Sequence, residues 1–253
     1  MSQDTPKTEQ RVDRAQWIDQ LPIDAATGVM LANQAEAIDA LQNAVADMAR
    51  AIRAIADRLR GDDAGRLIYV GAGTSARVGV QDGAELLPTF AFPAARVDFV
   101  IAGGPEALMR PVENAEDSAD AAATQIAALN IGAGDCVVGL AASGNTPFTC
   151  HAIELARTAG ALTVGIANNA DTRLLSVAEI GILLDTGAEA VAGSTRLKAA
   201  TAQKICLNIL STGAMCALGH VRNGLMVSME PRNAKLRDRH RIIRETLATD
   251  GGG

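Results

Sequence analysis

Hydrophobic residues near the start of the chain recur at alternating steps of three and four. Between about Val29 and Arg60 they form a heptad-like series at Ile38, Leu41, Val45, Met48, Ile52, Ile55 and Leu59. This spacing predicts one long helix whose apolar stripe needs a partner helix, either in the same domain or across a dimer. The preceding residues 1–28 are polar and predicted to be irregular, apart from a short stretch around Trp17 to Leu21.

Beyond Gly61–Gly65, which is predicted to break the helix, the pattern changes to short apolar runs. They cover Arg66–Val70, Val97–Ala102, Cys136–Ala141, Leu162–Ala167 and Ile180–Asp185. Helical stretches separate these runs, at about 75–87, 105–128, 147–159 and 171–178. Continuous apolar strands that alternate with helices predict a five-stranded parallel sheet covered on both faces. The expected fold class is therefore α/β, a doubly wound three-layer α/β/α sandwich.

After Gly193 the chain is predicted to be helical again. A long helix is expected over Thr195–Leu218, and a basic segment, Arg232–Arg244, then leads to Gly251–Gly253. Because no linker is evident, we expect one structural unit flanked by N- and C-terminal helices. Its two parts are a tail with the long helix at 1–60, and the α/β body with its C-terminal helices at 61–253.

Composition narrows the classes of function. The chain has 253 residues, of which 48% are hydrophobic, and this fraction excludes a disordered protein. Aromatic residues make up only 2%, too few for the stacking platforms that bind single-stranded nucleic acid. A net charge of -6 also makes a nucleic-acid partner unexpected, so an anionic ligand would need local donors.

The cysteines and the hydropathy pattern indicate the compartment. Cys136, Cys150, Cys206 and Cys216 show neither C-x-x-C nor His-spaced patterns, which favours reduced buried thiols over a metal or disulfide site. No apolar run reaches the ~18 residues of a membrane span, and the N-terminal MSQDTPKTEQR is too polar for a signal peptide. We therefore expect a cytoplasmic protein without a membrane partner.

A glycine-containing turn follows the first predicted strand. In Gly71–Ala76, the residues Gly73, Thr74 and Ser75 come directly before a helix. Backbone N–H groups at such a turn, together with the positive end of the helix, favour an anion. The turn formally matches G-x-G-x-x-A, but the second strand ends in Ala102-Gly103-Gly104 where a dinucleotide site needs an acidic residue, so NAD is disfavoured.

A second such turn follows the third predicted strand. It contains Ser143, Gly144, Asn145 and Thr146, and Pro147 then suits the first turn of a helix. Ordinary helix capping would also explain the two hydroxyl residues. Two hydroxyl-bearing turns at the carboxyl edge of one parallel sheet nevertheless favour a phosphorylated ligand held by uncharged donors.

At these residues the sequence resembles the N-acetylmuramic acid 6-phosphate etherase family, whose members have the sugar-isomerase (SIS) phosphosugar-binding fold. The resemblance covers about residues 8–240, and the block at 187–204 also resembles glucokinase regulatory protein. The matching blocks are TEQR (8–11), RLIYVGAGTSARVGVQDGAELLPTF (66–90), IAGG (101–104), ENAEDS (113–118), ASGNTPF (142–148), GIANN (165–169), GAEAVAGSTRLKAATAQK (187–204) and LMVSMEPRNAKL (225–236).

The resemblance implies an SIS sandwich that forms a homodimer, with its active site near the subunit interface. It implies a carbon–oxygen lyase that removes the D-lactyl ether from C3 of N-acetylmuramic acid 6-phosphate. The products would be N-acetylglucosamine 6-phosphate and D-lactate, in the recycling or use of peptidoglycan sugars. The implied chemistry is elimination followed by addition of water, without a metal or a cofactor.

Two glutamates are implied as the catalytic pair, since elimination needs a base for C2–H and an acid for the lactate oxygen. By this resemblance Glu85 is the proton donor and Glu116 the general base. The neighbours of Glu85 (Ala84, Leu86 and Leu87) argue against full exposure, whereas the surroundings of Glu116 are polar.

Spacing along the chain adds a constraint on Glu85. It lies ten residues after Ser75, about 15 Å away if one helix joins them, which a sugar phosphate does not easily span. We therefore predict that the Ser143–Thr146 loop holds the phosphate while Thr74 and Ser75 contact the sugar. Glu85 is predicted either to fold back or to come from the dimer partner.

The block at 187–204 supplies further candidates. Lys198, with Arg196, is predicted either to provide a cation for the phosphate or an enolate-like intermediate, or to be an exposed residue at a helix start. Glu189 is expected to orient the sugar, and Ser194 to bind the substrate. The histidines, at positions 151, 220 and 240, are expected to be structural or exposed.

The chain departs from the family pattern around Glu85 and at Asn145, and it lacks the family's small C-terminal helical extension; these differences bear on substrate preference. Two other functions share the fold, a non-catalytic phosphosugar-binding regulator and an SIS-type phosphosugar isomerase. Retention of both glutamates favours the enzyme over the regulator, and the GSTRLK segment (193–198) is poorly explained by an isomerase.

Overall fold

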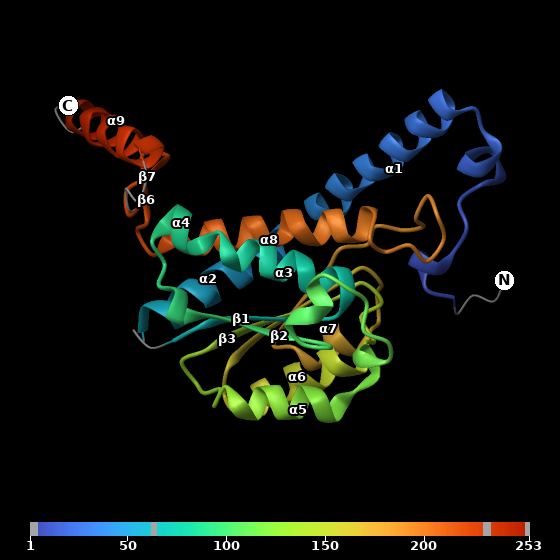
Figure 1. Cartoon of the computed structure of the whole chain (residues 1–253), viewed down its shortest axis with the longest axis horizontal. Coiled ribbons are helices and arrows are strands. Elements are labelled where there is room, and N and C mark those ends of the chain that lie inside the picture. Colours follow the sequence, from blue (N-terminus) through green and yellow to red (C-terminus); the bar gives the residue numbers. More distant parts are fainter. Residues whose placement is uncertain (1–4, 62–64, 230–233, 251–253) are drawn as a thin grey trace.

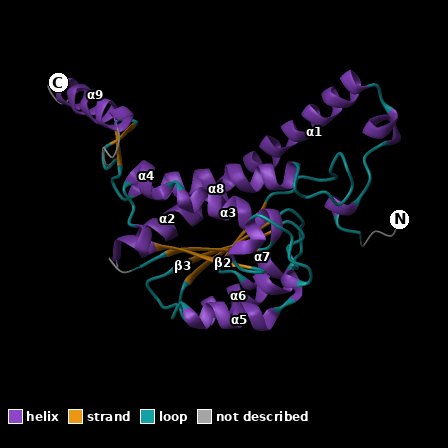
Figure 2. Cartoon of the chain, viewed as in Figure 1, coloured by secondary structure: helices purple, strands orange, loops and turns teal. Residues whose placement is uncertain are grey.

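A five-stranded parallel sheet forms the centre of the computed structural model, which describes residues 5–61, 65–229 and 234–250 (Figure 2). The strand order is β2-β1-β3-β4-β5. The five strands are β1 (Leu67–Gly71), β2 (Val97–Ile101), β3 (Cys136–Ala141), β4 (Leu162–Ala167) and β5 (Ile180–Leu183). The predicted fold class and all five predicted strands are confirmed.

Alternating side chains divide the core into two layers. Tyr69, Val138 and Val164 belong to one apolar cluster, and their sequence neighbours Ile68 and Val137 belong to another on the opposite face. In Figure 1 the first face is covered by α2 (Val45–Gly61), α3 (Gly73–Ala84) and α8 (Lys198–Ala217). The second face is covered by α5 (Ala119–Ala128), α6 (Pro147–Thr158) and α7 (Arg173–Val177). Helices on both faces explain why the strands are apolar throughout.

The chain leaves the sheet centre in opposite directions after β1 and β3, because β1 pairs with β2 on one side and β3 with β4 on the other. The two strands also pair with each other, with Gly71 opposite Leu140 near their carboxyl ends. The loops that follow them therefore open a crevice at this switch point, where open α/β sheets bind ligands.

The predicted single helix over 29–60 is wrong. Two helices occupy this region, α1 (Ile23–Asn43) and α2, and they meet at Ala44 without a Gly or Pro to mark the junction. The first helix also begins six residues before Val29, within the stretch predicted to be irregular. In Figure 1 α1 extends away from the body, and on it Ile38 of the predicted stripe is exposed whereas Leu41 is buried. On α2, Val45 is exposed and Met48 is buried.

The C-terminal part confirms a long helix, since α8 lies within the predicted Thr195–Leu218. The short hairpin β6 (Val221–Arg222) and β7 (Leu225–Met226) follows it, and then α9 (Ala234–Asp250), which stands apart from the sheet in Figure 1. Parts of four predicted segments lie outside the described residues: 1–4 of the N-terminal stretch, 62–64 of the helix break, 232–233 of the basic segment and 251–253. The division at residue 60 stays a prediction.

Candidate active site

A cavity of about 470 Å³ lies at the carboxyl edge of the sheet, within the size range of small-molecule sites. Loops after β1 and β3 form most of its wall. The 3₁₀ turns η1 (Lys7–Glu9) and η6 (Ala115–Asp117) add residues to it. The lining residues are Glu9, Ala72, Gly73, Thr74, Ser75, Glu116, Asp117, Leu140, Ala141, Ala142, Ser143, Asn145, Thr146, Pro147 and Thr195.

The helices α3 and α6 both begin at this cavity. Their N-cap residues, Ala72 and Thr146, make no side-chain capping hydrogen bond. N–H groups in the first turn of each helix are therefore left for a ligand, and the helix dipoles add partial positive charge. Simple capping by Thr146, the competing interpretation of this loop, is not what the structure shows.

Hydrogen bonds hold the β3–α6 loop in shape. The Ser143 Oγ accepts from the Asn145 backbone N–H at 3.2 Å, and the Asn145 Oδ1 accepts from the Arg173 N–H at 3.0 Å. The Gly144 carbonyl accepts from the Leu174 N–H at 2.9 Å. Asn145 thus uses its carbonyl oxygen to tie the loop to α7, while Ser143 and Thr146 line the cavity.

A chain of buried hydrogen bonds through two amide side chains holds the first turn of α3 in place. The Ser75 hydroxyl donates to the Gln203 Oε1 at 2.9 Å, and the Gln203 Nε2 donates to the Asn168 Oδ1 at 2.9 Å. Asn168 in turn donates to the Leu184 carbonyl at 3.1 Å. Because the Ser75 proton is used within the protein, Ser75 can only accept a hydrogen bond from a ligand. Sequence reasoning missed Gln203 and Asn168, although both lie in blocks that resemble the family.

Three carboxylates line the same cavity. Glu116 and Asp117 lie on η6 rather than on the predicted helix over 105–128, because Asn114 takes a left-handed conformation (φ 57°) and α5 starts only after Ser118. The third is Glu9, from the TEQR block, which was not among the predicted site residues. No Lys, Arg or His of the described chain lines this cavity, so its positive potential comes from backbone N–H groups.

Comparison with known proteins places these features in a family. The glucokinase regulatory protein N-terminal SIS domain matches residues 47–157, and the SIS domain matches residues 109–216. N-acetylmuramic acid 6-phosphate etherase of Deinococcus radiodurans is 44% identical, with 98% of this chain and 81% of that protein covered. The etherase of Rubrobacter xylanophilus is 47% identical, with 96% of this chain and 79% of that protein covered. The chain belongs to the N-acetylmuramic acid 6-phosphate etherase family.

This etherase-family chain also shares its fold with solved phosphosugar proteins. A putative phosphosugar isomerase from Bacteroides fragilis superposes with a TM-score of 0.59 at 15% identity, covering 80% of this chain and 95% of that one. Phosphoheptose isomerase from Neisseria gonorrhoeae superposes with a TM-score of 0.55 at 18% identity, covering 78% of this chain and 98% of that one. At such identities the similarity shows the SIS fold alone.

Glu85, one of the two glutamates implied by the etherase resemblance, does not line the cavity. It follows the last residue of α3, whose first turn contains Ser75, and α4 (Leu86–Phe90) begins at the next residue. Its side chain is exposed, contrary to the expectation drawn from its apolar neighbours; Leu86 takes the buried position instead. Within one subunit Glu85 therefore does not fold back to Glu116.

The structure gives Glu189 and Lys198 another role than the predicted one. Glu189 is fully buried, and its two oxygens accept from the Lys198 and Ala199 backbone N–H groups at 3.0 and 2.9 Å, which caps α8. Lys198 is also fully buried and pairs with Glu36 of α1. Neither lines the cavity, and from this block Thr195 does so instead of Ser194.

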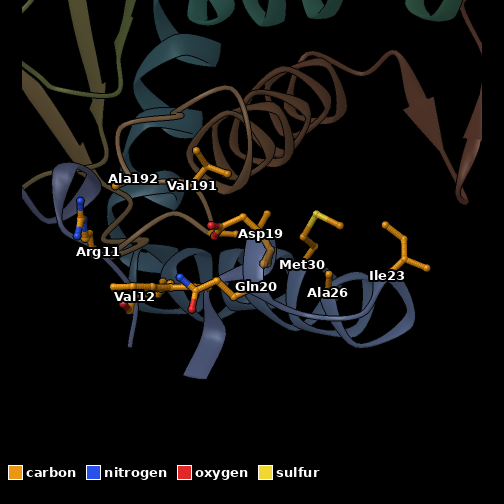
Figure 3. Close-up of a pocket in the computed structure, with 12 residues that line it drawn as sticks. Arg11, Val12, Asp19, Gln20, Ile23, Ala26, Met30, Val191 and Ala192 are labelled. Carbon is orange, nitrogen blue, oxygen red and sulfur yellow. Dashed lines mark hydrogen bonds between the residues drawn. The ribbon is translucent and has the colours of Figure 1, made fainter. Parts of the chain in front are cut away.

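A second cavity, of about 610 Å³, lies in the N-terminal arm (Figure 3). Its lining is mainly apolar and includes Ile23, Ala26 and Met30 of α1, facing Val191 from the loop before α8. No residue of the two glycine-containing loops lines it. Within the described ranges, no helix is long and apolar enough to cross a membrane.

Proposed function

We propose that this chain is an N-acetylmuramic acid 6-phosphate etherase, which converts its substrate to N-acetylglucosamine 6-phosphate and D-lactate. Identity of 44% over nearly the whole chain to an etherase carries this conclusion. The cavity supports it with two uncapped helix N-termini for an anion and carboxylates for proton transfer. The phosphate lies in the β3–α6 loop, because there the Ser143 and Thr146 hydroxyls line the cavity, whereas the Ser75 hydroxyl already donates its hydrogen bond to Gln203.

The reaction proceeds on the opened sugar, whose C1 aldehyde makes C2–H acidic. Glu116 removes the C2 proton, the C3–O bond breaks, and a protonated Glu85 gives its proton to the departing lactate oxygen. The intermediate then has a C2–C3 double bond. Water adds its oxygen to C3 and a proton returns to C2, which leaves the 3-hydroxyl of the product. That no metal takes part stays a prediction.

The catalytic pair needs two subunits in this proposal. Glu85 is exposed at the end of α3 opposite to the cavity, so a second copy of the chain brings it to Glu116. An unpartnered apolar surface supports a homodimer: Ile23, Leu31 and Ile38 are 78%, 71% and 47% exposed along the projecting α1. The second cavity lies on the same arm and belongs to this contact surface.

The cytoplasm is the proposed compartment. Cys136, Cys150 and Cys206 are buried free thiols, and desolvation raises the pKa of Cys136 and of Cys206 to about 12, so both stay protonated and unreactive. Free thiols of this kind are typical of a reducing compartment.

Release of D-lactate tests the function. Purified protein is incubated with N-acetylmuramic acid 6-phosphate, and lactate is measured enzymatically. The Glu116→Gln variant keeps the size of the side chain but cannot take up the C2 proton, so turnover falls by about a hundredfold or more. Glu113→Gln, on the same exposed segment but outside the cavity, keeps wild-type turnover.

Two results would contradict this proposal. Equal turnover in Glu116→Gln and wild type would remove Glu116 from the chemistry. Saturable binding of the sugar phosphate without any lactate would instead favour a phosphosugar-binding regulator, the function indicated by the match to the glucokinase regulatory protein domain.

A further inference from the structure

Glu9 reaches the cavity from outside the α/β body, and its neighbour Thr8 is firmly anchored. Thr8 is 1% exposed, and all its polar groups are used. Its N–H donates to the Asn169 Oδ1 at 3.4 Å, its Oγ1 accepts from the Asn169 Nδ2 at 3.0 Å, and its carbonyl accepts from the Gly193 N–H at 2.9 Å. These hydrogen bonds hold the backbone next to Thr8, and therefore that of Glu9, in position.

The anchor is tied to the wall of the cavity itself. Asn169 also donates to the carbonyl of Ala142, in the loop that carries Ser143, at 3.0 Å. On the other side, a Cβ built on Gly193 would lie 2.7 Å from the Glu9 Oε2, so the carboxylate rests directly over the Gly193 backbone. Gly193 has a φ of 76°, which favours glycine, and this close approach is a second reason for glycine there.

The Glu9 carboxylate has no donor in the protein. Its side chain makes no hydrogen bond or ion pair with the part of the chain that the structure describes, and no basic side chain there shares the cavity. Glu9 is exposed and its carboxylate is an acceptor only, so a ligand that displaces water from it must supply donors in return. A phosphate or a lactyl carboxylate placed against Glu9 would be repelled by the charge of Glu9 itself. The neutral donors of the sugar remain, among them its hydroxyl groups.

We propose that Glu9 is a substrate-binding residue whose carboxylate accepts hydrogen bonds from hydroxyl groups of the sugar. This inference rests on the proposed function. By accepting these hydrogen bonds Glu9 orients the sugar, and its charge repels the lactyl carboxylate, which directs the lactyl group away from η1. Glu9 takes no proton in the reaction, so its loss affects binding more than turnover.

Binding of the product, N-acetylglucosamine 6-phosphate, tests this with wild type, Glu9→Gln, Glu9→Ala and Thr8→Val. Charge-assisted hydrogen bonds are lost in Glu9→Ala, so the dissociation constant rises about tenfold or more, and KM for lactate release rises likewise. The dissociation constant of Glu9→Gln lies between those of wild type and Glu9→Ala. Thr8→Val keeps the carboxylate but loosens its anchor, and also weakens binding. Asp13→Asn, an exposed carboxylate on the same segment, is the matched control and binds as wild type does.

Inhibition by inorganic phosphate separates a binding role from a structural one. Phosphate occupies the β3–α6 loop, so its inhibition constant is unchanged in Glu9→Ala, whereas general damage to the cavity would weaken the binding of both phosphate and product.

Unchanged product binding in Glu9→Ala would overturn the inference about Glu9. Lactate release by wild type would at the same time leave the proposed function intact. If wild type binds the product and Glu9→Ala weakens this binding, but wild type releases no lactate, the proposed function alone would be overturned. Wild type that neither releases lactate nor binds the product would overturn both.

Discussion

Gly144 decides the course of the loop that is proposed to bind phosphate. Its φ is 69°, and a Cβ at this position would overlap the Thr172 side chain. In Gly144→Ala the loop must shift, which moves Ser143 and Thr146 away from the phosphate. We expect KM to rise about tenfold or more, as for loss of a hydrogen bond to a charged group, and the melting temperature to fall because left-handed backbone is strained for alanine. Lactate kinetics and thermal unfolding measure the two effects.

Gly132→Ala is the control for that substitution. Gly132 lies in the turn before β3, away from the cavity, and a Cβ at this position would meet no atom within 4 Å. Its KM stays at the wild-type value. Equal KM in Gly144→Ala and wild type would contradict the assignment of the phosphate to this loop.

Sequence motifs locate side chains near a site better than they decide which of them face it. Ser143 and Thr146 line the cavity, and the alternation of apolar and polar runs located them at a strand end, whereas only the family resemblance singled out Glu116. Glu189 and Lys198 belong to an equally specific block but are buried at the start of α8. Their partners decide this, and Glu36 lies 162 residues away from Lys198, beyond the reach of local patterns.

At the scale of elements, an ion pair joins the strands at the edge of the sheet opposite to the cavity. Arg66 donates to both oxygens of Asp135, at 3.1 and 2.9 Å. Burial raises the pKa of the Asp135 carboxyl, but hydrogen bonds from Arg66 and from the Gly132 and Arg66 backbones outweigh it, so the pKa is lower than usual. The pair ties the start of β1 to the start of β3.

Asp135→Asn tests this tie. A lowered carboxyl pKa means that the contribution to stability is present at neutral pH and is lost as the pH falls through that pKa. At pH 7 we expect the free energy of unfolding to fall by about 2 kcal/mol, because the partly buried Arg66 loses its hydrogen bonds to one carboxylate and keeps only Asp98 as a charged partner. The free energies of unfolding of Asp135→Asn and wild type become equal in strongly acidic solution. Urea unfolding at both pH values measures this.

Asp57→Asn provides the comparison, since Asp57 pairs with Arg60 on the exposed surface of α2. Its unfolding midpoint stays at the wild-type value. A difference between Asp135→Asn and wild type that persists unchanged in acid would contradict an electrostatic tie.

The elements with the most regular patterns were predicted best. The central strands β1, β3 and β4 are apolar on both faces, so their runs are continuous and their ends are sharp. The junction at Ala44 has no such signal: the apolar spacing continues through it, and only the direction in which α1 leaves the body separates the two helices. The turns over 105–117 depend on the left-handed conformation of Asn114, which the helical spacing did not reveal.

At the scale of the whole molecule, one subunit does not complete the site that the family resemblance implies. Glu116 lines the cavity, whereas Glu85 lies at the far end of the 12-residue helix α3, about 15 Å from Ser75 in its first turn. The projecting α1 leaves large apolar side chains exposed. A homodimer that buries this arm and exchanges Glu85 accounts for both features, and a symmetric dimer builds two such sites.

Mixing two inactive variants measures that exchange directly. Glu85→Gln and Glu116→Gln are purified separately, mixed in equal amounts under conditions that allow subunits to exchange, and tested for D-lactate release. Half of the dimers are then mixed, and each has one site with both glutamates, so activity recovers to about a quarter of wild type. Each variant alone stays inactive. A mixture that remains inactive although subunits have exchanged would contradict a site shared between two subunits.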